Sequence, residues 1–551
     1  MPKKTGRLGG IKVYFTNLNY PGLVLGALMV YASFLPSLLP RGWVLQGILS
    51  AVLFSIGYGI GVVISYIARA FKPSEPKLKQ KEQIKRWSYW AMLALFVIFV
   101  ILGMQWQHTV TKLVGMPPEN EAYIIGIAFV FTLVTAFILL VSRSIRTLFG
   151  WFKRQTLRLL PKSLAIGLAW IVTLLVIVGL LNGVILNFFG GALNEFYSTK
   201  NDKTNEGIVQ PTNPELSGSS ASDIPWDTLG RQGRNFIGEA TPVKKLNEFN
   251  HASAMNPVRV YSGLKSADTT QARADLAVKD LERAGGFKRK IIVIVTTTGT
   301  GWVDEDGVEP VEYMYNGDSA IVAMQYSYLP SSLSFLVDQS KALAAGRDLY
   351  SAVYSHWLQL PVDNRPRLVV FGESLGSFGS ENAFTGLADF KGSAGGAVWV
   401  GPPNFNTLWR QYTHARDAGS PEILPVYQSG ETLRYAAHPG DFAHPDSTWT
   451  EPRAVYLQNP SDPIVWWSPK LLFERPDWLD EPRGADVSGS TRWLPIVTFW
   501  QVSGDMVFST GVPDGHGHKY GKLPTDAWTY VAPPAGWTTT QAQELKKFFN
   551  G

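Results

Sequence analysis

Five apolar runs in the first third of the chain constrain its fold more than any other feature. They cover residues 20–40, 44–67, 87–106, 122–141 and 163–189. A helix that crosses ~30 Å of hydrocarbon needs ~20 residues, and each run reaches that length. Basic loops separate the runs, and only 17 % of all residues are charged, against about a quarter in soluble domains. The pattern predicts an α-helical transmembrane bundle of five spans, not five buried helices of a soluble protein.

Lysine and arginine are unevenly distributed around these runs, and this asymmetry predicts an orientation. The N-terminal tail and the second and fourth loops together hold 17 of these residues, whereas the first and third loops hold only Arg41 and Lys112. Short loops rich in Lys and Arg stay in the cytoplasm, so we expect a cytoplasmic N-terminus and, after five crossings, an extracytoplasmic C-terminal region. The chain is predicted to be a multi-pass plasma-membrane protein with membrane lipids as partners. The asymmetry also explains the net charge of +6, so we expect no nucleic-acid binding.

A polar stretch follows the last apolar run. Residues 198–223 are rich in Ser, Thr, Asn, Asp and Pro and lack an apolar period, which is typical of a linker. We therefore expect a five-helix transmembrane domain over residues 1–190, a linker over 191–230 and a catalytic domain over 231–551.

The C-terminal region alternates between short β-branched runs and stretches with helical spacing. Strands are expected at residues 290–296, 319–324, 367–371, 396–400, 453–457 and 496–502, and a long helix at residues 339–358. Strands that alternate with helices predict an α/β fold with a mostly parallel sheet and helices on both faces. In such sheets the functional residues collect at the carboxyl ends of the strands.

One of these carboxyl ends carries a G-x-S-x-G string. Gly372-Glu373-Ser374-Leu375-Gly376 directly follows the strand expected at residues 367–371. Between a strand and a helix this string forms a sharp turn that presents the serine hydroxyl, and its glycines avoid clashes with neighbouring backbone. The alternative is a glycine-rich loop with an incidental serine. The position in the alternating pattern favours Ser374 as a nucleophile.

A serine nucleophile needs a base and a group that orients the base, and in this fold they follow in the order Ser, Asp or Glu, His. Asp462 lies in a turn just after the strand expected at residues 453–457 and is the expected acid. Weaker alternatives are Asp441, Asp446 and Asp505. Only His516 and His518 follow Asp462; we favour His518 as the base, with His516 as second choice. No third ligand groups with them and the chain has no cysteine, so we expect no metal site.

An acyl-transfer site also needs N–H donors for the developing oxyanion. Leu375, directly after the nucleophile, is expected to supply one of them. The second is expected from the backbone of the glycine-containing loop after the 290–296 strand, with Thr298 and Gly299 as first candidates. That loop lacks the lysine of a phosphate-binding P-loop, and we expect no cofactor.

Aromatic residues are frequent in the later loops. Trp466 and Trp467 lie just beyond Asp462, and we consider them candidates for lining a substrate channel. Packing of the core or of the loops is the alternative, because tryptophan is large and mostly apolar.

Six segments together resemble a known family: TTTGTGW, MQYSYLPS, FGESLGS, WVGPP, LQNPSDPIVWW and GHGHKY. They are similar to the actinobacterial α/β-hydrolase membrane proteins, which combine a multi-span N-terminal region with a C-terminal hydrolase domain. The resemblance covers nearly the whole chain. It implies a Ser-Asp-His triad at Ser374, Asp462 and one of the two histidines, and it implies no particular substrate.

The leading hypothesis is a membrane-anchored serine hydrolase that acts outside the cytoplasm on an ester, with an envelope lipid or glycolipid as a suitable substrate. An esterase and an acyltransferase would use the same residues, so the sequence does not separate them. The alternative is a non-catalytic lipid-binding, scaffold or transport-associated membrane protein with a hydrolase-like domain.

Overall fold

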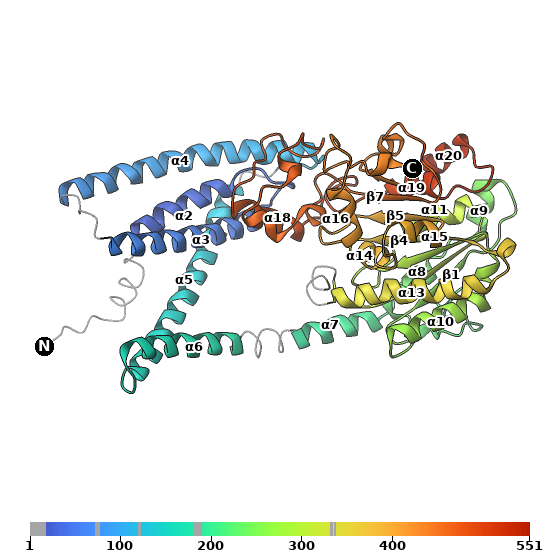
Figure 1. Cartoon of the computed structure of the whole chain (residues 1–551), viewed down its shortest axis with the longest axis horizontal. Coiled ribbons are helices and arrows are strands. Elements are labelled where there is room, and N and C mark those ends of the chain that lie inside the picture. Colours follow the sequence, from blue (N-terminus) through green and yellow to red (C-terminus); the bar gives the residue numbers. More distant parts are fainter. Residues whose placement is uncertain are drawn as a thin grey trace. The chain divides into compact units, whose positions relative to one another are not determined.

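The chain forms two compact units (Figure 1). The computed structural model describes residues 18–71, 78–118, 123–180, 190–330, 334 and 338–550. The helical unit comprises residues 1–185 together with 469–479 and 485–505, and the sheet unit comprises the rest. Two C-terminal segments thus belong to the helical unit, which the sequence pattern did not predict.

Among the described residues of the helical unit, four helices are long and apolar enough to cross a membrane. These candidate spans lie within α3 (Trp43–Ala70), α4 (Leu78–Leu113), α5 (Tyr123–Thr156) and α6 (Lys162–Leu180). They match the second to fifth apolar runs of the sequence. The end of the fifth run, residues 181–189, lies outside the described residues.

The first apolar run does not form a fifth span of full length. It folds as α2 (Tyr20–Ser33), which has 14 residues and is therefore about 21 Å long. Pro36 follows closely, and a proline disfavours helical backbone in the residue before it and removes an N–H donor. The expectation of five spanning helices is not confirmed, because the second part of the first run is non-helical.

Close backbone contact joins α2 to α3. A Cβ atom on Gly57 would lie 2.6 Å from the carbonyl oxygen of Leu25, and one on Gly61 would lie 2.5 Å from that of Pro21. Small residues spaced four apart let two membrane helices approach in this way. The two glycines of α3 therefore serve packing.

Residues 497–502 form the start of a helix, so the expectation of a strand over residues 496–502 was wrong. A short apolar run does not distinguish a strand from a buried helix by periodicity alone. The helix is α18 (Val497–Val507), and one of its faces carries Val497, Gln501 and Asp505, spaced four apart. Val497 packs against Leu49 and Leu53 of α3. The Asp505 carboxylate accepts hydrogen bonds from the backbone N–H groups of Leu38 and Leu39 at 3.1 and 3.4 Å. A side chain of α18 thus supplies hydrogen-bond acceptors to the non-helical backbone that follows α2.

In the described part of the sheet unit, seven parallel strands form one sheet in the order β1-β3-β2-β4-β5-β7-β6. They are β1 (Val258–Ser262), β2 (Ile291–Thr296), β3 (Ser319–Met324), β4 (Arg367–Glu373), β5 (Gly396–Val400), β6 (Leu433–Ala436) and β7 (Arg453–Leu457). Five of them were expected from the sequence, whereas β1 and β6 were not. The predicted α/β class with a mostly parallel sheet is confirmed for this unit.

Helices cover both faces of the sheet (Figure 1), with α10 and α13 on one side and α11 and α19 on the other. The helices of this unit are α7 (Gly190–Asp202), α8 (Gly230–Gly238), α9 (Val243–Asn250), α10 (Thr270–Arg283), α11 (Glu305–Met314), α13 (Gln339–Gln359), α14 (Leu375–Glu381), α15 (Leu387–Ser393), α16 (Thr407–His414), α17 (Pro463–Trp466), α19 (Leu523–Val531) and α20 (Thr539–Asn550). The strands are buried along almost their whole length, as expected for a sheet covered on both faces.

The polar stretch that reads as a linker packs against the sheet unit. The buried carboxylate of Asp280 on α10 accepts hydrogen bonds from the hydroxyls of Ser217 and Ser222, at 2.5 and 3.0 Å, and from the N–H of Asp223 at 3.0 Å. These serines therefore have a structural role that polar composition alone does not reveal. The predicted boundaries at residues 190 and 231 stay a prediction.

Candidate active site

Ser374 lies in a strained turn between β4 and α14. Its backbone has φ 55° and ψ −124°, a region that non-glycine residues enter only when the surrounding structure enforces it. A Cβ atom on Gly372 would lie 2.4 Å from the carbonyl oxygen of Gly376, and one on Gly376 would lie 2.3 Å from that of Thr296. Only glycine fits at these two positions, which gives the physical reason for the G-x-S-x-G string. The turn has the form of a nucleophile elbow.

Asp462 and His518 meet beyond the carboxyl end of β7. Oδ2 of Asp462 lies 2.7 Å from Nδ1 of His518, and the same oxygen accepts the hydroxyl of Tyr520 at 2.7 Å. Oδ1 accepts the N–H of Ile464 at 2.8 Å, the first free donor of α17. The carboxylate is fully buried and only accepts, so Nδ1 of the imidazole must carry the proton. Nε2 is then left with a free lone pair, which is the form a general base needs.

The imidazole of His518 lies against Gly401, which directly follows β5, the strand paired with β4. Strands β4 and β5 pair Glu373 with Val400, and the N–H of Ser374 donates to the carbonyl of Val400 at 2.8 Å. The next residue on β5 is Gly401, and a Cβ atom there would lie 2.5 Å from Cε1 of His518. Within the described part of the chain, Nε2 of His518 is buried and has no hydrogen-bond partner. The structure therefore brings Ser374, Asp462 and His518 to one edge of the sheet, with no direct bond between the serine hydroxyl and the imidazole.

His516, the second-choice base, is placed differently. It is partly buried, and its carbonyl accepts the N–H of Lys519 at 3.2 Å in the turn that carries His518. His518 is in direct contact with Asp462. Among the other acids, Asp441 accepts the N–H groups of Ala437 and His438 in its own turn, whereas Asp446 is exposed.

The loop after β2 has its backbone donors partly engaged. The N–H of Thr298 donates to the carbonyl of Trp302 at 3.0 Å, and that of Gly301 donates to the carbonyl of Thr298 at 2.9 Å. Within the described residues no hydrogen bond engages the N–H of Gly299 or that of Leu375. Gly299 and Leu375 are therefore better placed than Thr298 to serve as oxyanion donors, and their assignment stays a prediction.

Two further carboxyl groups lie beside the elbow. Burial and the charge of Asp462 together raise the pKa of Glu373 to about 7, although a hydrogen bond with Asp304 lowers it. Burial and the Glu373 charge also raise the pKa of Asp304. The pair therefore keeps a proton to higher pH than two free carboxyl groups would, which limits the negative charge near Asp462. Among the described residues no group of three or more His, Asp or Glu side chains is arranged to hold a metal ion.

The two tryptophans proposed for a substrate channel differ in their surroundings. Trp466 is 1 % exposed, packs edge to face on Trp409 and donates its indole N–H to the carbonyl of Asn459 at 3.2 Å. This burial favours the packing alternative for Trp466, and its role in a substrate channel stays a prediction. Trp467 is half-buried, and its role stays a prediction.

Sequence reasoning missed the residues that hold the histidine loop against Asp462. The amide of Asn459 donates to the carbonyl of Gly517 at 2.9 Å, and the hydroxyl of Ser461 accepts the N–H of Gly517 at 2.8 Å. The hydroxyl of Tyr520 accepts the N–H of Asn459 at 3.2 Å. Burial and the Asp462 charge raise the pKa of Tyr520, which keeps this hydroxyl a donor to the carboxylate. These residues lie in the NPSD and GHGHKY segments, close in sequence to Asp462 and His518, and this closeness was the signal that could have found them.

Comparisons with known proteins identify the family of the chain. Residues 258–545 match a family model described as an alpha/beta-hydrolase family. This chain belongs to that alpha/beta-hydrolase family. Residues 34–241 match the model of the family's N-terminus, so the four candidate spans of this alpha/beta-hydrolase lie within a region that the family shares. No curated protein and no solved structure matches the chain.

Proposed function

We propose that the protein is a membrane-anchored serine hydrolase that cleaves or transfers the acyl group of an ester. The observation that carries this proposal is the strained Ser374 beside an Asp462–His518 pair joined at 2.7 Å. A binding or scaffold domain has no need for an energetically costly serine backbone next to a buried, correctly protonated histidine. The geometry therefore favours catalysis over the non-catalytic alternative.

In the first half-reaction, Oγ of Ser374 attacks the ester carbonyl carbon while its proton passes to Nε2 of His518. Asp462 holds the imidazole in the required tautomer and stabilises the imidazolium. The N–H groups of Leu375 and Gly299 would donate to the oxyanion. Collapse of the tetrahedral intermediate breaks the ester bond, and the leaving alkoxide takes the proton from His518. The acyl group is then bound to Ser374.

The second half-reaction releases the acyl group. His518 removes a proton from water, or from an acceptor hydroxyl, and the resulting oxygen attacks the acyl carbonyl. The bond between the acyl carbon and Oγ of Ser374 then breaks, and Oγ takes the proton back from His518. Water gives a free acid, and an alcohol gives a new ester. The same residues perform both reactions, so product analysis with and without an added alcohol separates a hydrolase from an acyltransferase.

The candidate spans suggest a substrate that shares the membrane, such as an envelope lipid or glycolipid. We propose that the sheet unit is extracytoplasmic. This orientation requires the first apolar run to cross as α2 plus the non-helical segment after it. Non-helical backbone is tolerated at membrane depth where protein groups satisfy it, and Asp505 and Gln501 bond the backbone of residues 35–39. A C-terminal alkaline phosphatase fusion should be active outside the cytoplasm, and an inactive fusion would reject this orientation.

Labelling with a fluorophosphonate probe tests the catalytic proposal. The full chain in detergent should label, and Ser374→Ala should abolish labelling. Ser351→Ala, at an exposed position of α13, is the matched control and should label as the wild type does. Folded wild-type protein that fails to label supports the binding alternative.

A further inference from the structure

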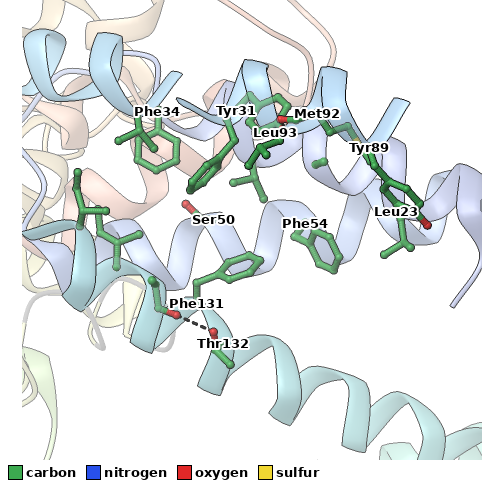
Figure 2. Close-up of a pocket in the computed structure, with 17 residues that line it drawn as sticks. Leu23, Tyr31, Phe34, Ser50, Phe54, Tyr89, Met92, Leu93, Phe131 and Thr132 are labelled. Atoms are coloured by element: carbon green, nitrogen blue, oxygen red, sulfur yellow. Dashed lines mark hydrogen bonds between the residues drawn. The ribbon is translucent and has the colours of Figure 1, made fainter. Parts of the chain in front are cut away.

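Two cavities of the helical unit share a wall at Phe54 of α3. The larger is an apolar chamber of about 500 Å³ between α2, α3, α4 and α5 (Figure 2). The smaller is a cleft of about 270 Å³ between α3 and α5. Phe54 lines both of them, and neither takes part in the proposed chemistry at Ser374.

The chamber is suited to hydrocarbon. On α2 its lining runs from Leu23 to Phe34, eleven residues apart, or about 16 Å, which is close to half of a ~30 Å hydrocarbon core. Figure 2 shows Tyr31 and Phe34 on one wall and Phe54 and Phe131 on the other. A lipid chain of one leaflet therefore matches the chamber in length and in chemistry.

The hydroxyl groups of the chamber are mostly occupied by protein partners. Tyr31 donates to the carbonyl of Met92 at 2.5 Å, and Ser50 lies 2.8 Å from the hydroxyl of Ser33. Thr132 donates to a carbonyl one turn before it at 2.7 Å. The remaining hydroxyl belongs to Tyr89, which is 50 % exposed. A polar ligand would find few partners within the chamber.

The cleft adds positive charge at one end. Its lining includes Arg143 and Arg146 of α5 together with Ser55 and Tyr58 of α3. Arg143 lies twenty residues after Tyr123, where α5 begins, or about 30 Å along the helix. A full hydrocarbon thickness therefore separates the arginines from the other end of the span, which places them at headgroup depth. Basic pockets between membrane helices bind the headgroups of anionic lipids.

We propose that the helical unit binds one anionic phospholipid, with its phosphate at Arg143 and Arg146 and an acyl chain running along the α3–α5 cleft towards Phe54 and the chamber. Arg143 and Arg146 belong to the fourth loop region, which the proposed orientation places on the cytoplasmic side. The lipid would thus come from the cytoplasmic leaflet. This binding site is separate from the proposed catalytic site and does not depend on it.

Titration of the delipidated full chain with lipids, followed by native mass spectrometry, tests the charge requirement. The probes are dioleoyl phosphatidylglycerol and dioleoyl phosphatidylcholine, which have the same chains. At ~1 kcal/mol for each arginine, the wild type should prefer the anionic lipid by about thirtyfold, or ~2 kcal/mol. Arg143→Gln/Arg146→Gln should lose this preference. The matched control is Arg154→Gln/Arg158→Gln, which removes the same charge outside both cavities and should keep it.

A second pair of variants tests the cleft itself. Gly59 lines the cleft, and among the described residues no atom lies within 4 Å of the position that a Cβ atom would take there. Gly59→Leu should therefore fill the cleft without a clash and lower the affinity for both lipids. Gly150 on α5 is equally open but lines neither cavity, so Gly150→Leu should bind as the wild type does. Three results would overturn the proposal. The wild type could bind both lipids with equal affinity, the control variants could lose as much preference or affinity as the test variants, or folded Gly59→Leu could bind both lipids as the wild type does.

Discussion

Replacement of Asp462 by asparagine should separate the geometry of the proposed triad from its chemistry. The side chain is fully buried and accepts from His518, Tyr520 and Ile464. Asparagine has nearly the same shape, but its amide NH2 cannot accept. If that NH2 faces Nδ1 of His518, the imidazole must carry its proton on Nε2 instead, and the base is lost. We expect the reaction rate to fall about a thousandfold to ten-thousandfold, or ~4–5 kcal/mol.

The assay measures two rates on the full chain in detergent: the second-order rate constant of fluorophosphonate labelling and the hydrolysis of a p-nitrophenyl ester. Asp446→Asn, at an exposed position, is the control and should react as the wild type does. Thermal unfolding identifies variants that are merely unfolded. A folded Asp462→Asn protein that labels at the wild-type rate would refute the assignment of Asp462.

Three further predictions concern stability. Burial raises the pKa of Glu373 to about 7, so the folded state keeps a proton that the unfolded state releases above about pH 4.5. The free energy of unfolding should therefore fall by up to ~3 kcal/mol as the pH rises from about 4.5 to 7. Glu373→Gln should flatten this decline, which is measured as the unfolding midpoint at each pH. Gly376→Ala should abolish probe labelling and destabilise the fold by ~1–3 kcal/mol, since its Cβ atom would lie 2.3 Å from the carbonyl oxygen of Thr296. Gly392→Ala, where among the described residues no atom is within 4 Å, should have no such effect. Asp505→Ala should destabilise the helical unit by ~3 kcal/mol in a thermal melt, because it strips two backbone N–H groups of their buried acceptor; an unchanged melting temperature contradicts this role.

Much of the sheet unit could be predicted because its signals are local. Strands β3, β5 and β7 have the predicted bounds, since each is a short β-branched run between turn residues. Strands β1 and β6 were missed because they contain arginines, Arg259 and Arg434, which suggest exposure. In the structure both arginines are buried and bonded, Arg259 to Glu312 and Arg434 to backbone carbonyls. Such pairing partners come from other elements and leave no local pattern.

The candidate site, too, could be predicted from the sequence only in part. Chain order favoured Asp462 and left two histidines, and the structure adds a contact between Asp462 and His518 that the sequence could not show. The donors of the loop after β2 could not be ranked from the sequence, because the bond from Thr298 to Trp302 depends on how the loop turns. The sequence could not separate the two roles considered for Trp466, because tryptophan fits a substrate channel and a packed loop equally well by composition.

The sequence by itself located the four apolar runs that form candidate spans, although it predicted a fifth, and it determined the α/β class and the strand-turn-helix around Ser374, because apolar period and glycine spacing act over a few neighbouring residues. Only the tertiary structure decided that residues 497–505 form a helix in the helical unit. It also decided that Asp462 meets His518 and that two arginines line a cleft that shares Phe54 with an apolar chamber. These outcomes rest on contacts between segments far apart in the chain, whose energies appear only when both partners are buried together.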